Sequence, residues 1–215
     1  LAYGVNSPKG SVQIQKSSRL SDVSTNNSMY TLKDAKYGLY SDSGCTKKIG
    51  EFILDEKGSS NIISNLSVAK YYVREITAPK GYAKNDTVYP VDVKSNQVVE
   101  VAVSDVPYTN LVSLMLVKKD KEDSSKPLKD AQYVFKFYDQ DSTAGSALRT
   151  WTMKTDANGK ILMDDAHKVS GDDFYKDVDG MVCLPLGTIT VQEVVPPKGY
   201  LLDPTVFVQK LEEKN

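Results

Sequence analysis

Tyr71–Tyr82 reads YYVREITAPKGY, and a near-copy returns at Ile189–Tyr200, which reads ITVQEVVPPKGY. Each copy begins with residues that alternate as they do in a β-strand, carries a glutamate near the end of that strand, and closes with a Pro-Lys-Gly-Tyr turn. Such alternation predicts a half-buried strand, and the proline and glycine mark the turn after it. The repeat therefore indicates two related β-rich units.

The glutamate of each copy is predicted to point into a core. Successive side chains of a strand point to opposite faces, so Glu75 lies on the same face as Tyr71 and Val73. Glu193 occupies the matching position of the second copy. Because a lone buried carboxylate is costly unless it is paired or protonated, both positions call for a chemical explanation.

Composition places the chain among globular proteins and limits its partners. The 215 residues are 40% hydrophobic and 26% charged, with a net charge of −1 and basic residues interspersed among acidic ones. This balance gives no nucleic-acid surface, and no apolar run is long enough to span a membrane. We expect no partner of either kind.

The repeat favours two domains of roughly 100 residues each over one large domain. We predict a first domain at 1–107, of which about ten N-terminal residues are linker-like, and a second at 108–215. The opening stretch Leu1–Gly10 reads as the end of a preceding segment, so the sequence is expected to come from a longer chain.

Short strands separated by Gly, Pro, Asn and Ser turns predict an all-β fold of two tandem immunoglobulin-like β-sandwiches. The second domain is expected to open with one continuous strand at 111–118. The polar segment 17–27 is predicted to be a loop, and the acidic stretch after 163 to hold a helical turn. The other predicted strands are 11–16, 37–40, 49–54, 62–66, 87–93, 97–104, 131–138, 147–155, 161–163, 181–184, 188–193 and 205–211.

Three ionisable residues of the first domain lie on the apolar faces of their strands. Lys16 ends the first strand, Glu75 a central one and Asp105 the last. If they meet, burial favours a neutral, nucleophilic amine and a protonated Asp105, and Glu75 can transfer the protons. The product would be an isopeptide bond. Strand parity alone leaves a second interpretation open, a buried ion network without covalent chemistry.

The sequence resembles the Cna B-type (SpaA-like) domains of Gram-positive surface adhesins and pilins over nearly its whole length. The motifs that carry the resemblance are VQIQK at 12–16, YYVREITAPKGY, VEVAVSD at 99–105, LMLVKKD at 114–120, PLKDAQYVF at 127–135 and ITVQEVVPPKGY. The resemblance implies an isopeptide triad of Lys16, Glu75 and Asp105, in which the glutamate is catalytic. Lys118 and Glu193 would be its second-domain counterparts. Lys119 is the weaker candidate because it shares a face with Ser113.

The second domain departs from this pattern. Matching the two repeats leaves it without a counterpart of Val98–Asp105, and Asn215, its only late asparagine, would fall in the turn before that strand. We predict an incomplete domain with an open edge, in which Lys118 is unreacted and pairs with Glu193. An open edge of this kind accepts a strand donated by a neighbouring chain. The pilin motif Tyr-Pro-Lys is absent, since Val91 follows Tyr89-Pro90.

Other reactive residues give weaker signals. Cys45 and Cys183 fall in different domains and are predicted to be free, inert thiols. His167 is predicted to be a solvated loop residue. The aspartates between Asp164 and Asp179 do not have EF-hand spacing, so we expect no metal and no cofactor.

The predicted function is structural: a stalk region of a Gram-positive cell-wall-anchored surface protein, extracellular and attached to other domains of that protein. Glu75 would act once, so the chain is not predicted to be a turnover enzyme. One alternative is a ligand-binding adhesin region that recognises a host matrix protein or glycan. A third reading is an accessory β-domain of a secreted hydrolase.

Overall fold

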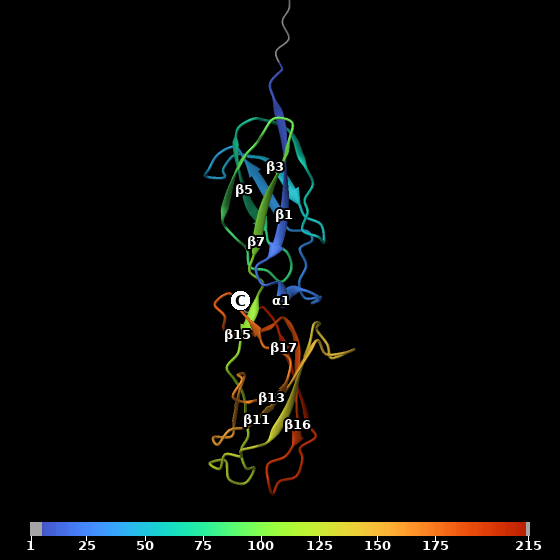
Figure 1. Ribbon diagram of the computed structural model, residues 1–215, viewed down its shortest axis with the longest axis vertical. Helices are drawn as coiled ribbons and strands as arrows, with labels where there is room; N and C mark the ends of the chain where they lie inside the picture. The colour runs from blue at the N-terminus through green and yellow to red at the C-terminus, as the bar shows by residue number, and fades with distance from the viewer. Residues whose placement is uncertain (1–5, 214–215) are drawn as a thin grey trace, which may run out of the picture. The chain divides into compact units, whose positions relative to one another are not determined.

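A computed structural model describes residues 6–213, which form two compact units (Figure 1). The first unit contains the chain up to Ser21 together with Tyr30–Pro107, and the second contains Asp22–Met29 and the chain from Tyr108 onward. Residues 22–29 belong to the second unit because their side chains bond to it: Asn27 Nδ2 donates to the Leu186 carbonyl at 3.0 Å. The described residues form no helix long and apolar enough to cross a membrane.

The first unit is a sandwich of two sheets, with strand orders β4-β1-β7 and β3-β2-β5-β6. Its strands are β1 Lys9–Ser18, β2 Lys36–Tyr40, β3 Lys48–Ile53, β4 Ile63–Ser67, β5 Lys70–Thr77, β6 Val88–Asp92 and β7 Val98–Asp105. The first and last strands pair in parallel over eight residues, from Ser11 opposite Val98 to Ser18 opposite Asp105. The last strand therefore fills the place beside the first.

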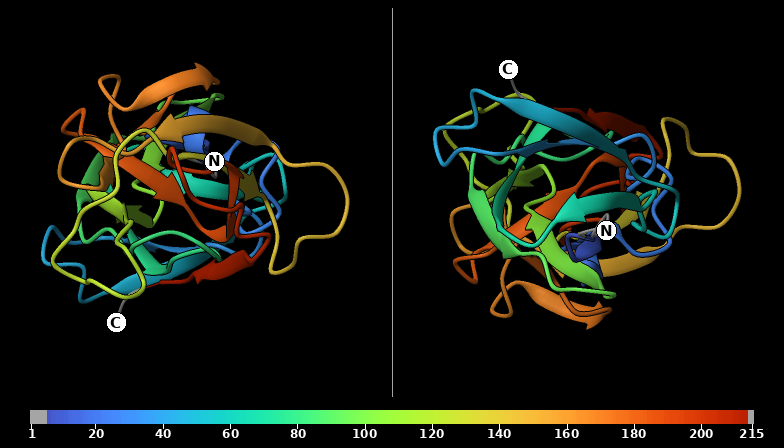
Figure 2. Two further views of the ribbon diagram at one scale, coloured as in Figure 1. Left: turned by 90° about the horizontal axis from the view of Figure 1, so that it is seen from below. Right: turned by 90° about the horizontal axis from the view of Figure 1, so that it is seen from above.

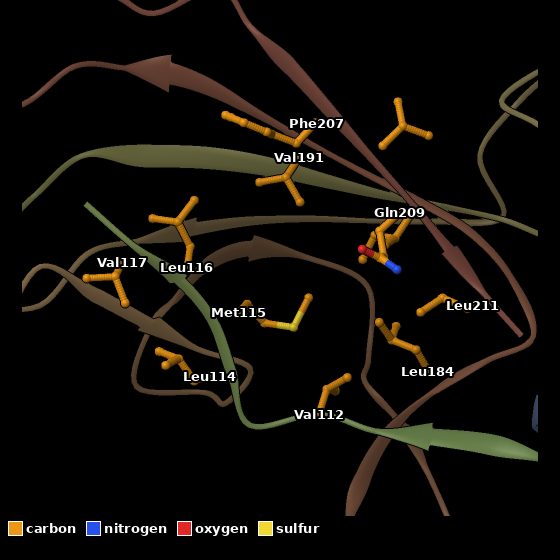
Figure 3. Close-up of a pocket in the computed structure, with 12 residues that line it drawn as sticks. Val112, Leu114, Met115, Leu116, Val117, Leu184, Val191, Phe207, Gln209 and Leu211 are labelled. Carbon is orange, nitrogen blue, oxygen red and sulfur yellow. The ribbon is translucent and has the colours of Figure 1, made fainter. Parts of the chain in front are cut away.

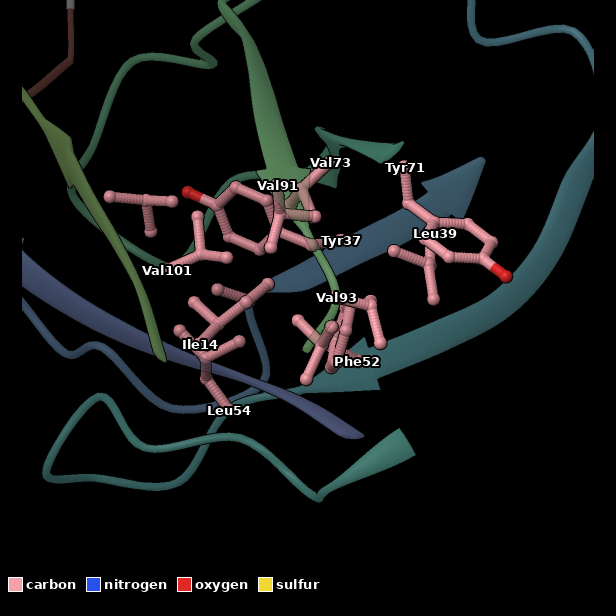
Figure 4. Packing of buried hydrophobic residues seen from close by; sticks show 13 residues of the cluster. Ile14, Tyr37, Leu39, Phe52, Leu54, Tyr71, Val73, Val91, Val93 and Val101 are labelled. Carbon is pink, nitrogen blue, oxygen red and sulfur yellow. The ribbon is translucent and has the colours of Figure 1, made fainter. Parts of the chain in front are cut away.

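The core of the first unit lies between these sheets (Figure 4). Val12 and Ile14 of β1, Val73 of β5 and Phe52 of β3 are fully buried. The strands alternate buried and partly exposed residues, so the period-two pattern of the sequence becomes one apolar face per sheet. This face also carries the ionisable residues, because their positions have the same parity as the core residues.

The second unit repeats this plan with differences. Its elements are α1 Ser21–Ser24, β8 Thr109–Leu111, β9 Leu114–Val117, β10 Gln132–Tyr138, β11 Arg149–Lys154, β12 Lys160–Leu162, β13 Lys168–Gly171, β14 Tyr175–Lys176, β15 Val182–Pro185, β16 Gly187–Val195 and β17 Val206–Leu211. The main sheet has the order β13-β11-β10-β16-β17, and smaller sheets are β12-β9 and β14-β15-β8. The loop between β10 and β11, gold in Figure 2, projects from the side of the main sheet.

The all-β prediction is confirmed, and three local predictions are wrong. The strand expected at 111–118 is broken at Val112 and Ser113, because β8 pairs with β15 whereas β9 pairs with β12. The acidic stretch holds β13 and β14, and the helical turn expected there is present at 164–168, where the Lys168 N–H donates to the Asp164 carbonyl at 3.2 Å. The segment 17–27 contains the single turn α1, and β1 starts at Lys9, inside the stretch predicted to be linker.

Candidate functional site

Lys16, Glu75 and Asp105 meet in the core of the first unit. Lys16 Nζ lies 3.1 Å from Glu75 Oε1 and also hydrogen-bonds Asp105 Oδ2, and all three side chains are buried. Lys16 is paired with Val103 in the parallel register, so Asp105 lies two residues further along β7 on the same face. Strand alternation puts each of the three residues on the core face, and the parallel pairing of β1 with β7 brings Lys16 and Asp105 into contact.

Two residues that the sequence interpretation missed also bond to this pair, Tyr37 to Lys16 and Asn85 to Glu75. Tyr37 of β2 lies directly opposite Glu75 of β5 in the sheet, and its hydroxyl is 2.5 Å from Lys16 Nζ. The backbone N–H of Asn85 donates to Glu75 Oε2 at 2.7 Å. Hydrogen bonds of this kind fix the glutamate's orientation beside the amine. The repeated motif LKDA-x-Tyr, at 32–37 and 128–133, was the signal that would have identified this tyrosine.

The electrostatics of the site make Asp105 easier to protonate than an ordinary aspartate. Burial raises the pKa of Asp105 to about 6. The hydrogen bond from Lys16 lowers this pKa, but the hydrogen bond with Glu75 and the charge of Glu75 act in the opposite direction. Asp105 Oδ1 has no hydrogen-bond partner among residues 6–213. An unpaired buried carboxylate oxygen is costly, which adds to the tendency of Asp105 to take up a proton. The site thus holds the Lys16 amine and the Asp105 carboxyl group in contact, with both side chains fully buried.

The second unit contains the corresponding lysine and glutamate. Lys118 Nζ lies 3.2 Å from Glu193 Oε1, and Glu193 is the one carboxylate paired with it in the described part of the chain. The Tyr133 hydroxyl and the Asp203 N–H donate to Glu193 at 3.3 and 2.7 Å; the Asp203 bond corresponds to that of Asn85 with Glu75. The side chain of Lys118 is 21% exposed, whereas that of Lys16 is fully buried.

The glycine turns beside the two lysines are also equivalent. The N–H of Lys16 donates to the Gly58 carbonyl at 2.8 Å, and that of Lys118 to the Gly159 carbonyl at 2.7 Å. Both glycines have positive φ, and a Cβ on either would lie within 2.4 Å of the lysine carbonyl oxygen. Only glycine combines this conformation with so close an approach. Lys119 is exposed, which agrees with its ranking as the weaker candidate.

An apolar groove of about 570 Å³ lies along β9, whose last residue, Val117, precedes Lys118, on the side that corresponds to the place of β7 beside β1 in the first unit (Figure 3). Side chains of β9 and of the β16–β17 hairpin line it, among them Leu116, Val191 and Phe207. In the described residues β9 pairs only with β12, whereas β1 pairs on both sides. Leu114, four residues before Lys118, is consequently 49% exposed, whereas Val12, four residues before Lys16, is fully buried. Asn215 lies outside the described residues.

The remaining candidates do not form a reactive centre. His167 is 8% exposed, with Nδ1 2.7 Å from Asp164 and Nε2 3.3 Å from Asp156, so the prediction of a solvated histidine was wrong. Cys45 and Cys183 are buried free thiols, and burial raises the pKa of Cys183 to about 11. Residues 6–213 contain no cluster of three potential metal ligands.

These observations define the class: tandem β-sandwich domains in which a buried Lys–Glu pair sits between the first strand and a central strand. Residues 9–107 and 113–215 each match the sequence model of the SpaA family, described as a prealbumin-like fold domain. The chain therefore belongs to this family, as the resemblance in its motifs indicated.

Solved structures agree at the level of the fold. The Bacillus anthracis TIE protein matches 96% of this chain with a TM-score of 0.64 and 21% identity, and this chain covers 32% of its length. The C-terminal fragment of the pilus adhesin SpaC from Lactobacillus rhamnosus GG matches 94% of this chain, which covers 81% of the fragment, with a TM-score of 0.55 and 17% identity. No curated protein sequence matches the chain.

Proposed function

We propose that the first unit cross-links itself through an isopeptide bond between Lys16 and Asp105, and that the chain is a stalk region of a cell-surface adhesin or pilin-like protein. The observation that carries this proposal is the fully buried contact of Lys16 with both carboxylates. A charged amine so far from water is costly, and condensation with Asp105 removes both charges.

The reaction balances within the site. Proton transfer along the contact between Lys16 Nζ and Asp105 Oδ2 gives a neutral amine and a carboxylic acid. The amine attacks Asp105 Cγ, Glu75 takes a proton from the nitrogen and returns it to the departing hydroxyl, and one water leaves. One C–N bond forms, one C–O bond breaks, and Glu75 ends as it began. Fixed contact between the reactants supplies the effective concentration.

A bond at these positions suits a load-bearing stalk. It joins residues 89 apart in sequence and links the first strand to the last, so it closes almost the whole unit into one loop. Closing so long a loop restricts the unfolded chain, as a disulfide does, but an amide resists reduction. In this proposal the chain lies outside the cell at the wall, its partners are other domains of the same protein, and it performs no turnover catalysis.

For the second unit we propose that a β-strand from outside residues 6–213 completes the groove beside Lys118. The first unit supplies the pattern, since β7 places Val101 and Val103 in the core and an acid two residues beyond the partner of Lys16. The groove beside Lys118 is apolar in the same way. An added strand of this sequence type would pair with β9 in parallel and present its acid to Lys118.

Intact-mass measurement tests the first bond. The purified chain is expected to be lighter than its sequence by one water, and peptide mapping is expected to find a branched peptide that joins Lys16 to Asp105. Lys16→Met and Asp105→Ala are expected to restore the full mass, whereas Lys118→Met keeps the loss. A wild-type chain of full mass refutes the bond.

A synthetic peptide with the β7 sequence VVEVAVSD tests the groove. Incubation with the whole chain is expected to give an adduct whose mass is the sum of the two less one water, attached at Lys118. A peptide with asparagine in place of the last aspartate would also react, because the amide releases ammonia on attack. A peptide with alanine at that position would not react. Absence of any adduct, or attachment at exposed lysines alone, contradicts this assignment.

The alternative of a ligand-binding adhesin region makes the opposite prediction for a binding assay. A stalk is expected to bind nothing on an array of extracellular-matrix proteins and glycans. Saturable binding to one component, retained after the surrounding domains are removed, would favour the adhesin role.

A further inference from the structure

Tyr37 contributes a third hydrogen-bonding group to the buried lysine. Its hydroxyl lies 2.5 Å from Lys16 Nζ, and the ammonium also sits 5.0 Å from the centre of the tyrosine ring. Tyr37 is 1% exposed, so water does not substitute for this contact. The amine therefore has three partners, which are the tyrosine hydroxyl, Glu75 and Asp105.

The same tyrosine recurs in the second unit. Tyr37 is paired with Glu75 across β2 and β5, and Tyr133 is paired with Glu193 across β10 and β16. The Tyr133 hydroxyl donates to Glu193 Oε1 at 3.3 Å, whereas the Tyr37 hydroxyl accepts from Lys16 and lies near enough to Glu75 for that carboxylate to raise its pKa. Several neighbouring positions differ, such as Leu39 against Phe135 and Tyr71 against Ile189, whereas the tyrosine opposite the glutamate is retained in both units.

We propose that Tyr37 is a further catalytic residue of the isopeptide reaction, in which its hydroxyl accepts a hydrogen from Lys16 and so aims the amine lone pair at Asp105. The inference rests on the proposed bond.

The geometry of the nitrogen carries this argument. An ammonium has three hydrogens, and here each has one acceptor. When the hydrogen that faces Asp105 is transferred to that carboxylate, the lone pair is left pointing at Asp105, provided that the other two hydrogens stay bound to Tyr37 and Glu75. Without the tyrosine hydroxyl the amine can rotate about its Cε–Nζ bond, and an unpaired N–H remains in the core. A correctly aimed nucleophile is the main requirement of a reaction between groups already in contact.

The protonation of Tyr37 fits this role. Burial raises the pKa of Tyr37 far above its ordinary value, and the nearby charges of Asp105 and Glu75 raise it further. The phenol therefore keeps its proton and can donate it to Glu75 while an oxygen lone pair accepts from Lys16. One hydroxyl thus connects the nucleophile to the group that transfers its protons.

The test follows bond formation during timed cell-free synthesis of the whole chain, with samples quenched in acid and denaturant and the water-loss fraction read by intact mass. Tyr37→Phe removes only the hydroxyl, and is expected to slow bond formation about ten- to a hundredfold, the range for a hydrogen bond to a charged group. Tyr71→Phe is the matched control, because it removes the hydroxyl of another tyrosine of the same core, which donates to the Ser67 carbonyl at 3.1 Å. It should keep the wild-type rate.

A structural effect is separated from a catalytic one in a background that cannot react. In Lys16→Met chains, adding Tyr37→Phe or Tyr71→Phe is expected to lower the unfolding midpoint of the first unit by similar amounts. Equal stability with unequal reaction rates supports the proposal. Wild-type kinetics for Tyr37→Phe, in a chain that does lose water, overturn the role of the tyrosine alone. A wild-type chain that never loses water overturns the bond and this role together.

Discussion

Replacing Glu75 by glutamine should leave the first unit folded but uncross-linked. Glutamine has the same shape, and its amide oxygen can still accept the hydrogen bond that the Asn85 N–H gives to Glu75 at 2.7 Å. It cannot take a proton from Lys16, so the proposed condensation loses its proton-transfer group. The variant should therefore have the full mass of its sequence.

The expected loss of stability follows from the length of the loop that the bond closes. Lys16 and Asp105 are 89 residues apart. A cross-link over a loop of this length stabilises a protein by about 4–5 kcal/mol in the chain-entropy description. For a unit of about 100 residues, each kcal/mol shifts the midpoint of thermal unfolding by about 4 °C or more, so the first unit should unfold at least ~16–20 °C lower without the bond.

Calorimetry of the whole chain measures this difference, and the second unit supplies the control. Glu193→Gln removes the equivalent charge beside Lys118, where no acceptor is present in the described residues. It measures what the substitution alone costs. We expect a small shift of the second-unit transition in Glu193→Gln and a large shift of the first-unit transition in Glu75→Gln.

Two outcomes would refute the reasoning. Water loss at wild-type extent in Glu75→Gln would show that the glutamate does not transfer the protons. Shifts of equal size in the two variants, with a confirmed mass difference, would show that the bond does not stabilise the fold through its loop.

Three further predictions address single residues. Burial lowers the pKa of His167, but the hydrogen bonds to its two aspartate partners outweigh this effect and leave the pKa raised. The stability that these bonds give is therefore fully present below about pH 6.5, the ordinary pKa of histidine, and is lost as the pH rises through the raised pKa. Unfolding midpoints of the second unit should therefore fall above that pH, and His167→Gln should flatten the profile. Gly58→Ala should destabilise its unit by about 1–3 kcal/mol more than Gly180→Ala in denaturant titrations, because both glycines have φ of +78° but only at Gly58 would a Cβ lie 2.4 Å from a backbone oxygen. Phe207→Ala should lower the free energy of unfolding by less than about 1 kcal/mol, because Phe207 is 56% exposed. Phe135→Ala in the same unit should lower it by about 3–5 kcal/mol, because Phe135 is fully buried. Equal losses in the two variants would mean that the groove is filled.

Much of the fold and part of the site could be predicted because they depend on local pattern. Alternation fixed which face of each strand is apolar, and therefore predicted that Lys16, Glu75 and Asp105 point inward. Composition and turn residues predicted an all-β chain. The repeated Pro-Lys-Gly-Tyr turn predicted two related units.

Other features depend on which segments pair, and pairing is not encoded in local alternation. The strand expected at 111–118 divides because its two halves pair with different neighbours, β15 and β12. His167 is buried because it lies against the turn at Asp156, whose carboxylate is 3.3 Å from the histidine Nε2. The sequence around the histidine is polar, so local pattern gives no sign of this burial. Tyr37 was missed because tyrosine is common in strands.

The sequence by itself determined the fold class, the repeat and the three inward-facing ionisable residues of the first unit, since each follows from side-chain parity along one strand. Only the tertiary structure decided that these residues touch, because contact depends on the parallel register of β1 with β7 and on the pairing of β2 with β5. The same pairings place the Tyr37 hydroxyl on Lys16. Distances of 2.5 to 3.1 Å between three strands arise from that register, which no single strand can specify.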